Sequence, residues 1–205
     1  MQGKTAGARL RGVVLCAALL IAAAPAFASE DVQVVVYEAP RMFFSSPEHA
    51  PVLGGPGIGV GPGQPSFGAD PGERFAQALL RLLQDRTDAI LTLPARAVPG
   101  PRTTKQIENP RGSRSLVVFT TMNFLGYRPM RWATYQYGYG AYLRVVDDAA
   151  RTLVETRCIV KVNKSRPEFQ IARDELQAPG RFDAVVDRVV AECASGVVDE
   201  IAAAL

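Results

Sequence analysis

The sequence predicts an α/β (α+β) two-layer sandwich, in which a mixed sheet of about five strands has helices on one face. Residues 181–204 have a wide apolar stripe at helical spacing, which must lie against a sheet to be shielded from water. Segments 116–124, 132–146 and 153–162 are rich in β-branched and aromatic residues and are joined by short turns, which predicts an antiparallel meander. Residues 32–93 contain a strand, a helix and a second strand, an order that favours a parallel crossover.

The first predicted strand covers residues 32–37, because β-branched side chains favour extended backbone. A Gly/Pro-rich loop at 51–72 follows, in which 13 of 22 residues are Gly or Pro. Glycine widens the range of accessible backbone conformations and proline removes donors, so we expect no regular element there. The loop matches neither common phosphate-binding glycine pattern, and an arm that becomes ordered on a partner is the alternative.

The first helix is predicted to begin after Asp70, which is a favourable N-cap. Pro71 suits the first helical position, and Glu73 completes a capping box. The helix should end near Arg86, and a short apolar strand follows at 89–93. Its apolar face is formed by Phe75, Leu79, Leu82 and Leu83.

The C-terminal half begins with a loop at 94–114, and turns at 126–130 and 147–151 join the three meander strands. Residues 174–177 read as one helical turn. The final helix, at 181–204, is the element with the strongest periodicity. Its stripe consists of Phe182, Val185, Val186, Val189, Val190, Cys193, Val197 and Ile201.

Two cysteines, Cys158 and Cys193, remain when the N-terminal segment that contains Cys16 is set aside. Alternation places Cys158 on the core face of the last meander strand, and helical spacing places Cys193 on the core face of the final helix. The sulfurs should therefore face each other, and we predict a disulfide. The alternative is two buried free thiols that pack as small apolar groups.

Residues 1–28 have the pattern of a cleavable secretory signal, with a basic start, an apolar stretch at 12–24 and a small-residue site that ends at Ala28. The apolar stretch is too short for a membrane anchor, which needs about 20 residues. Leu15 before Cys16 disfavours lipidation. We therefore expect a single domain at 29–205 that is periplasmic or secreted after cleavage, with no transmembrane segment.

The charge balance argues against a nucleic-acid partner. The signal contains three of the 23 basic residues and none of the 20 acidic ones, which leaves 20 of each in the predicted mature chain. A nucleic-acid-binding protein needs a net basic face. Two more sequence features bear on partners, namely an aromatic strand and a basic segment.

Tyr135, Tyr137 and Tyr139 alternate with small or polar residues, so all three should lie on one face of the second meander strand. One interpretation is an aromatic platform for a lipid, glycan or peptide. The other is a sheet face packed against a helix or loop, with the intervening glycines marking a bulge.

Residues 96–131 contain seven basic residues and one acid, and Arg128 and Arg131 lie next to the aromatic strand. This segment predicts either a basic edge that meets anionic envelope material or a solvated loop balanced by the acidic final helix.

No catalytic residue, metal site or cofactor is predicted. The single histidine, His49, lies in a proline-flanked loop, where a solvated side chain is the simplest interpretation. The nucleophile pattern G-x-S-x-G does not occur in the sequence. The acidic residues could still form carboxylate pairs in space, so an uncharacterised hydrolase stays an alternative.

The hairpin from Tyr142 to Glu155, then Cys158, then a helix with a second cysteine resembles small proteobacterial envelope proteins. Their α/β domain is similar to that of curli-secretion-channel lipoproteins and peptidoglycan-synthase-activator lipoproteins. The resemblance covers about residues 116–205 and differs at Ser29, where those families have a lipidated cysteine. It implies an accessory role in the cell envelope rather than catalysis, and no catalytic residues are transferred from it.

These observations lead to three hypotheses of function. The first is a non-enzymatic periplasmic accessory or interaction protein with envelope proteins as partners. The second is a binding module for an envelope lipid, glycan or peptide that uses the aromatic strand and the basic edge. The third is a hydrolase.

Overall fold

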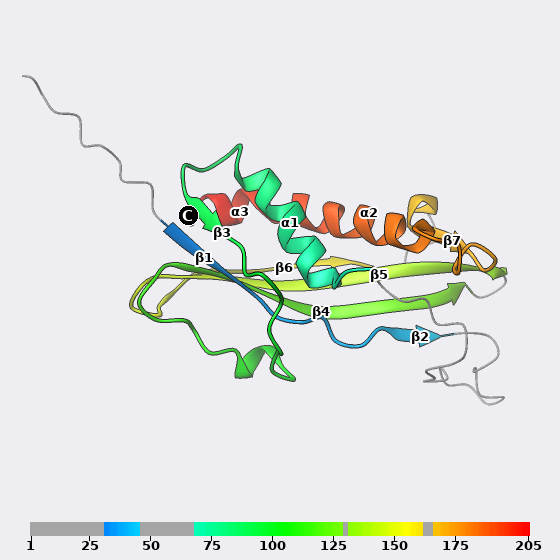
Figure 1. Ribbon diagram of the computed structural model, residues 1–205, viewed down its shortest axis with the longest axis horizontal. Helices are drawn as coiled ribbons and strands as arrows, with labels where there is room; N and C mark the ends of the chain where they lie inside the picture. The colour runs from blue at the N-terminus through cyan, green and yellow to red at the C-terminus, as the bar shows by residue number, and fades with distance from the viewer. Residues whose placement is uncertain (1–30, 46–67, 129–130, 162–165) are drawn as a thin grey trace, which may run out of the picture.

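The structure is a computed structural model that describes residues 31–45, 68–128, 131–161 and 166–205 (Figure 1). The predicted signal peptide, His49 and most of the Gly/Pro-rich loop lie outside the described residues. In chain order the elements are β1 (Asp31–Val36), β2 (Phe43–Ser45), α1 (Pro71–Leu83), β3 (Ile90–Thr92), η2 (Thr104–Gln106), β4 (Ser115–Arg128), β5 (Arg131–Val146), β6 (Thr152–Val160), η3 (Pro167–Phe169), β7 (Gln170–Ala172), α2 (Arg181–Ser195) and α3 (Val198–Ala202).

The sheet is mixed and curled, and its main strand order is β3-β1-β4-β5-β6. Strand β1 is parallel to both β3 and β4, whereas β4, β5 and β6 form the predicted antiparallel meander. Two three-residue strands were not predicted, because segments of this length show no periodicity. They are β2, which pairs with β4, and β7, which pairs with β5.

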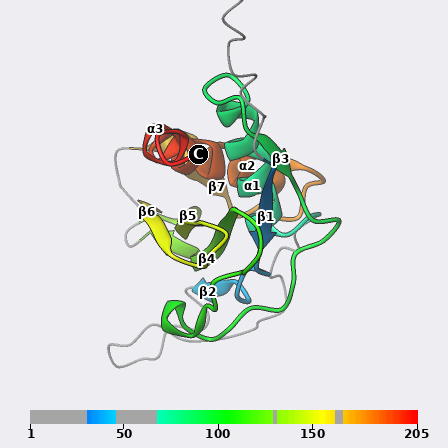
Figure 2. The same cartoon turned by 90° about the vertical axis from the view of Figure 1, so that its left-hand side faces the viewer.

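The helices lie on one side of the sheet, as predicted, and the loop that contains η2 lies on the other (Figures 1 and 2). The main core fills the space between helices and sheet, where Phe75, Leu79 and Leu143 are fully buried. A second, smaller cluster lies under the loop on the opposite face and contains Ile107, Val117, Phe119 and Tyr142.

Helix α1 begins as predicted, but Glu73 has a different role. The Asp70 side chain accepts from the N–H groups of Gly72 and Glu73, at 2.8 and 3.3 Å, and also from that of Ala39 at 2.9 Å. Glu73 does not complete a reciprocal capping box; its carboxylate accepts the N–H of Ala97 at 2.7 Å instead. The long loop after β3 is thereby attached to the first turn of the helix.

The final helix is not continuous, and this corrects the prediction of one helix at 181–204. Helix α2 ends at Ser195, and α3 begins at Val198 after a break at Gly196 and Val197, where Val197 leaves the helical conformation with a φ of −124°. Glycine is a weak helix former, so a break there costs little. Val197, Val198 and Ile201, at and after the break, are buried.

The predicted disulfide is confirmed. Cys158 of β6 is bonded to Cys193 of α2, with 5.4 Å between their Cα atoms and a sequence separation of 35. Both side chains are buried, as the alternation along β6 and the helical spacing of α2 required. The bond joins the outermost meander strand to the helix layer, and closing a loop of this size stabilises the fold by about 3–4 kcal/mol in the chain-entropy model.

Candidate functional site

The three tyrosines of β5 are buried in the main core. Tyr137 and Tyr139 are fully inaccessible and Tyr135 is 2% exposed. Phe182 packs edge-on against Tyr137, Phe75 packs against Tyr139, and Phe44 stacks on Tyr135, with ring centroids 5.5 to 5.7 Å apart. The packed interpretation is therefore the one observed, because the helices cover the face that an open aromatic platform would need.

The buried phenol groups are bonded to polar side chains of β4. Tyr137 donates to Asn123 Oδ1 at 3.0 Å, and the hydroxyls of Tyr139 and Thr120 are 3.1 Å apart. Burial, the largest cause, raises the pKa of Tyr137 and of Tyr139 well above the ordinary value. Both groups stay protonated at neutral pH, so they act as structural hydrogen-bonding groups.

One glycine of the aromatic strand, Gly140, does accompany a bulge, although the bulge lies on the neighbouring strand. The register between β4 and β5 shifts between Thr120 and Met122, and Gly140 pairs with Met122. A Cβ atom at residue 140 would lie 3.0 Å from Thr121 Oγ1 and 3.2 Å from Met122 Cβ. A glycine is needed here because the bulged strand approaches closely.

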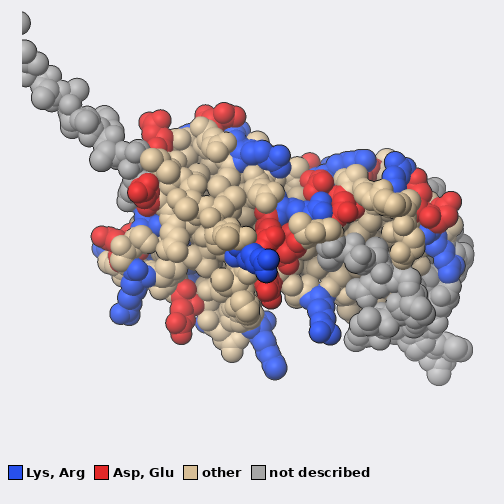
Figure 3. Space-filling model, viewed as in Figure 1, with Lys and Arg blue, Asp and Glu red and all other residues tan. Residues whose placement is uncertain are grey.

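The predicted basic edge is distributed along the loop rather than gathered around the tyrosines. Arg128 and Arg131 pair with each other where β4 turns into β5, and their side chains lie outside the described part of the structure. The loop residues Arg96, Arg102, Lys105 and Arg111 are exposed. Figure 3 shows several basic side chains projecting from the side of the molecule where this loop lies.

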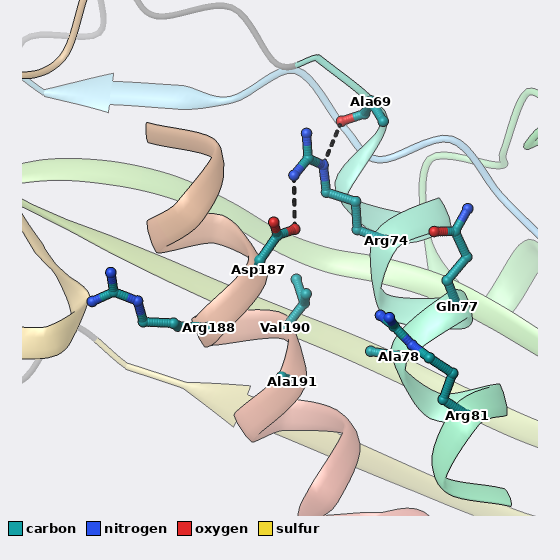
Figure 4. Close-up of a pocket in the computed structure, with 9 residues that line it drawn as sticks. All are labelled: Ala69, Arg74, Gln77, Ala78, Arg81, Asp187, Arg188, Val190 and Ala191. Carbon is teal, nitrogen blue, oxygen red and sulfur yellow. Dashed lines mark hydrogen bonds and ion pairs between the residues drawn. The ribbon is translucent and has the colours of Figure 1, made fainter. Parts of the chain in front are cut away.

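A groove of about 580 Å³ lies between α1 and α2, on the helix layer (Figure 4). Its apolar part is formed by small side chains of both helices, among them Ala78 and Val190. Its polar part comes from both helices as well. The lining residues are Ala69, Arg74, Gln77, Ala78, Arg81, Asp187, Arg188, Val190 and Ala191.

Ion pairs connect the two helices at one end of the groove. Arg74 of α1 contacts Asp183 at 2.5 Å and Asp187 at 2.7 Å, and its side chain is 15% exposed. Arg74 Nε also donates to the carbonyl of Ala69 at 3.4 Å (Figure 4). Because both aspartates accept from one guanidinium, Arg74 links α1 to α2 at this point.

The other arginines of the groove differ in how they are engaged. Arg188 donates to the carbonyl of Glu168 at 3.2 Å and points away from α1 (Figure 4). Arg81 and Gln77 are exposed on α1. The Arg81 guanidinium lies beside Ala78 on the side of α1 that faces α2, whereas the Gln77 side chain points away from α2 (Figure 4). The guanidinium geometry suits a carboxylate. The arrangement is one that binds an acidic group.

Among the described residues, only one carboxylate lines the α1–α2 groove and only one lines a second hollow. The α1–α2 groove contains Asp187, which is paired with Arg74. A second hollow, of about 470 Å³, lies between the chain after β1 and the loop at 99–102, and its lining includes Glu38 and Arg102. Within the described ranges, no three His, Cys, Asp or Glu side chains converge as metal ligands would. Likewise, no described helix has the length and apolar character needed to span a bilayer.

Sequence reasoning missed the groove, since its two walls are more than 100 residues apart in the chain. No family model matches this chain, and no curated protein matches it. Among solved structures it is similar to the crystal structure of protein XCC0632 from Xanthomonas campestris, which is described with the family model DUF330. The two chains are 12% identical with a TM-score of 0.42, and the match covers 85% of this chain and 82% of that one.

Proposed function

We propose that this protein is a non-enzymatic accessory protein of the bacterial cell envelope, and that it acts by binding an acidic segment of a partner protein in the α1–α2 groove. The observation that carries the proposal is the groove itself. One end is closed by the ion pairs of Arg74, the floor has small apolar side chains, and Arg81 and Gln77 are among the residues that line the groove.

The proposed location outside the cytoplasm is supported by two independent features. The Cys158–Cys193 disulfide favours an oxidising, extracytoplasmic compartment, because cytosolic thiols are kept reduced. Residues 1–28 have the pattern of a secretory signal. The predicted mature chain starts at Ser29, which leads us to propose release into the periplasm or the medium.

Binding is favoured over hydrolysis by the chemistry of the described hollows. Hydrolysis by paired carboxylates needs two acids in one cleft with different environments. Asp187 in the groove is engaged by Arg74, and Glu38 lies in the other hollow. The donors that face the groove are the guanidinium groups of Arg74 and Arg81, which recognise an acidic side chain without activating water (Figure 4).

Site-specific photo-crosslinking tests the groove in cells. A photoreactive residue at Gln77, which lies in the groove, should capture a partner that is identified by mass spectrometry. The same residue at Gln84, which is exposed at the end of the same helix, is the matched control and should not. Arg81→Glu should abolish the Gln77 adduct, since it places a carboxylate opposite the acidic segment. Equal capture from both positions, or capture that ignores Arg81→Glu, would contradict the proposal.

A second candidate function is contact with anionic lipid or glycan through the exposed basic loop. It is favoured by the exposure of Arg96, Arg102, Lys105 and Arg111 on one loop. Flotation with vesicles that contain phosphatidylglycerol tests it, and the Arg102→Gln, Lys105→Gln variant should release the protein from the vesicles. If binding is absent, or unchanged in this variant, the basic loop has no such role.

A further inference from the structure

Strand β6 forms one lateral edge of the sheet. It pairs with β5 along one side through residues Thr152 to Val160, and among the described residues no strand pairs with its other side (Figure 2). A free edge presents a row of backbone donors and acceptors that can pair with another strand. At nine residues, β6 is three times as long as β3, the strand at the opposite edge.

The outward face of β6 has an unusual order of side chains. Leu153, Glu155, Arg157 and Ile159 alternate along this face, away from the disulfide and the helices. Leu153 is 45% exposed and Ile159 is 54% exposed, which places both among the largest exposed apolar side chains of the described chain. The order is symmetric about Thr156. On the N-terminal side Glu155 comes first and then Leu153, and on the C-terminal side Arg157 comes first and then Ile159.

We propose that β6 is a homodimer interface, at which a second copy of this chain pairs antiparallel about a two-fold axis through Thr156. Antiparallel pairing about that axis places Glu155 opposite the partner's Arg157, and Arg157 opposite the partner's Glu155. It also places Leu153 opposite the partner's Ile159, and the reverse. Directly opposed residues of unlike charge, and opposed apolar residues, stabilise an antiparallel pair, and a two-fold interface repeats each contact.

Other registers are disfavoured by the same residues. With the two-fold axis at Glu155 or at Arg157, identical charges lie directly opposite each other, which destabilises the pair. An axis at Val154 places Glu155 opposite Leu153, and an axis at Cys158 places Arg157 opposite Ile159. Among the registers with the axis at residues 154 to 158, the outward face therefore favours the one at Thr156, whereas charges placed only to prevent edge pairing would repel in every register.

The edge is also held in place before any second copy binds. The disulfide attaches β6 to α2, and the Arg157 guanidinium lies over the Tyr142 ring at 5.4 Å. Glu155 lies 3.7 Å from Arg144 of β5 and 4.0 Å from Arg157. Fixing these side chains beforehand reduces the conformational entropy that is lost on association.

Charge exchange tests both the interface and its register. Sedimentation analysis of the disulfide-bonded chain should show a dimer for the wild type. In a Glu155→Arg homodimer, the introduced arginine faces the partner's Arg157 at two places, and in an Arg157→Glu homodimer glutamates face each other in the same way. Each single variant should therefore raise the dissociation constant of the dimer by at least about tenfold. An equimolar mixture of the two variants should form a heterodimer, because each arginine then faces a glutamate. A wild type that stays monomeric, or variants that do not combine, would overturn the proposal.

Two apolar substitutions give an independent result if a charge variant folds poorly. Ile159→Lys changes an exposed side chain at the proposed interface and should also weaken the dimer. Ile90→Lys changes a side chain of similar exposure, 52%, on the opposite edge strand and should leave the dimer intact. Equal dimerisation of these two variants would place the contact elsewhere.

Discussion

The two faces of the sheet are covered in different ways. One face is covered by α1, α2 and α3, which bury a large apolar cluster, are held to β6 by a disulfide and enclose the bonded tyrosines. The other face is covered by a loop that contributes Ile107 to a cluster of only a few residues. The helices therefore supply most of the core, whereas the loop covers the opposite face with fewer apolar side chains.

The largest expected difference in the free energy of unfolding is between two substitutions to alanine, one on each face of the sheet. Leu79→Ala removes a fully buried side chain of α1 and should lower the free energy of unfolding by about 3–4 kcal/mol. Ile107→Ala should cost only about 2 kcal/mol, because the loop around it can relax into the space. Urea denaturation of both variants measures the difference. Equal losses would show that the two clusters are equally rigid.

The disulfide gives the next largest effect, and it belongs to the helix-covered face. Changing both Cys158 and Cys193 to Ala should lower the free energy of unfolding by about 3 kcal/mol, since the unfolded chain is no longer constrained. Reductant should reproduce this loss in the wild type and leave the double variant unchanged. Thiol titration of the denatured wild type should find no free thiol at either position. Two free thiols there would contradict the bond.

A smaller effect is expected from the buried phenol groups. Tyr137→Phe removes the donor to Asn123 Oδ1 and should cost about 1–2 kcal/mol. Tyr37→Phe, at a half-buried position that packs edge-on against Phe119, is the control and should change stability by less than about 0.5 kcal/mol. Thermal unfolding at matched pH compares them. An equal loss in the control would argue that the Tyr137 hydroxyl bond does not contribute.

The smallest effect concerns pH and the turn between β5 and β6. The backbone N–H of Arg151, and then its side chain, lower the pKa of Asp147 below 3.8, with N–H and guanidinium distances of 2.8 and 2.7 Å. A lowered folded pKa means that this stabilisation is present above the unfolded pKa and is lost as the pH falls through the folded value. Asp147→Asn should therefore make the free energy of unfolding fall less steeply as the pH is lowered. An unchanged acid slope would exclude the turn as its source.

The spacing of apolar and capping residues in the sequence predicted most of the long helices and strands. The capping residue Asp70, the alternation of the tyrosines in β5 and the core positions of Cys158 and Cys193 followed from periods of 2 and 3.6 residues. Strands β2 and β7 did not follow, because three residues are too few to show a period. The capping-box role of Glu73 was wrong, because a tertiary bond to Ala97 replaced the local one.

The candidate site lay beyond such reasoning. Arg74 meets Asp183 and Asp187 only because two helices far apart in the chain are placed side by side on one sheet. Likewise, alternation placed the tyrosines on one face and left open whether that face was covered. The sequence pattern allowed both a ligand and a covering helix on this face, and Phe75 and Phe182 pack against it.

By itself, the sequence determined helix α1, the long strands, the faces on which the core residues lie and the pairing of the two cysteines. It could do so because these depend on the spacing of residues that are near each other in the chain. Only the tertiary structure decided that the tyrosines are buried, that a groove lies between α1 and α2, and that β6 forms a free edge. Each of these depends on which distant segments come into contact, and that is set by packing over the whole core.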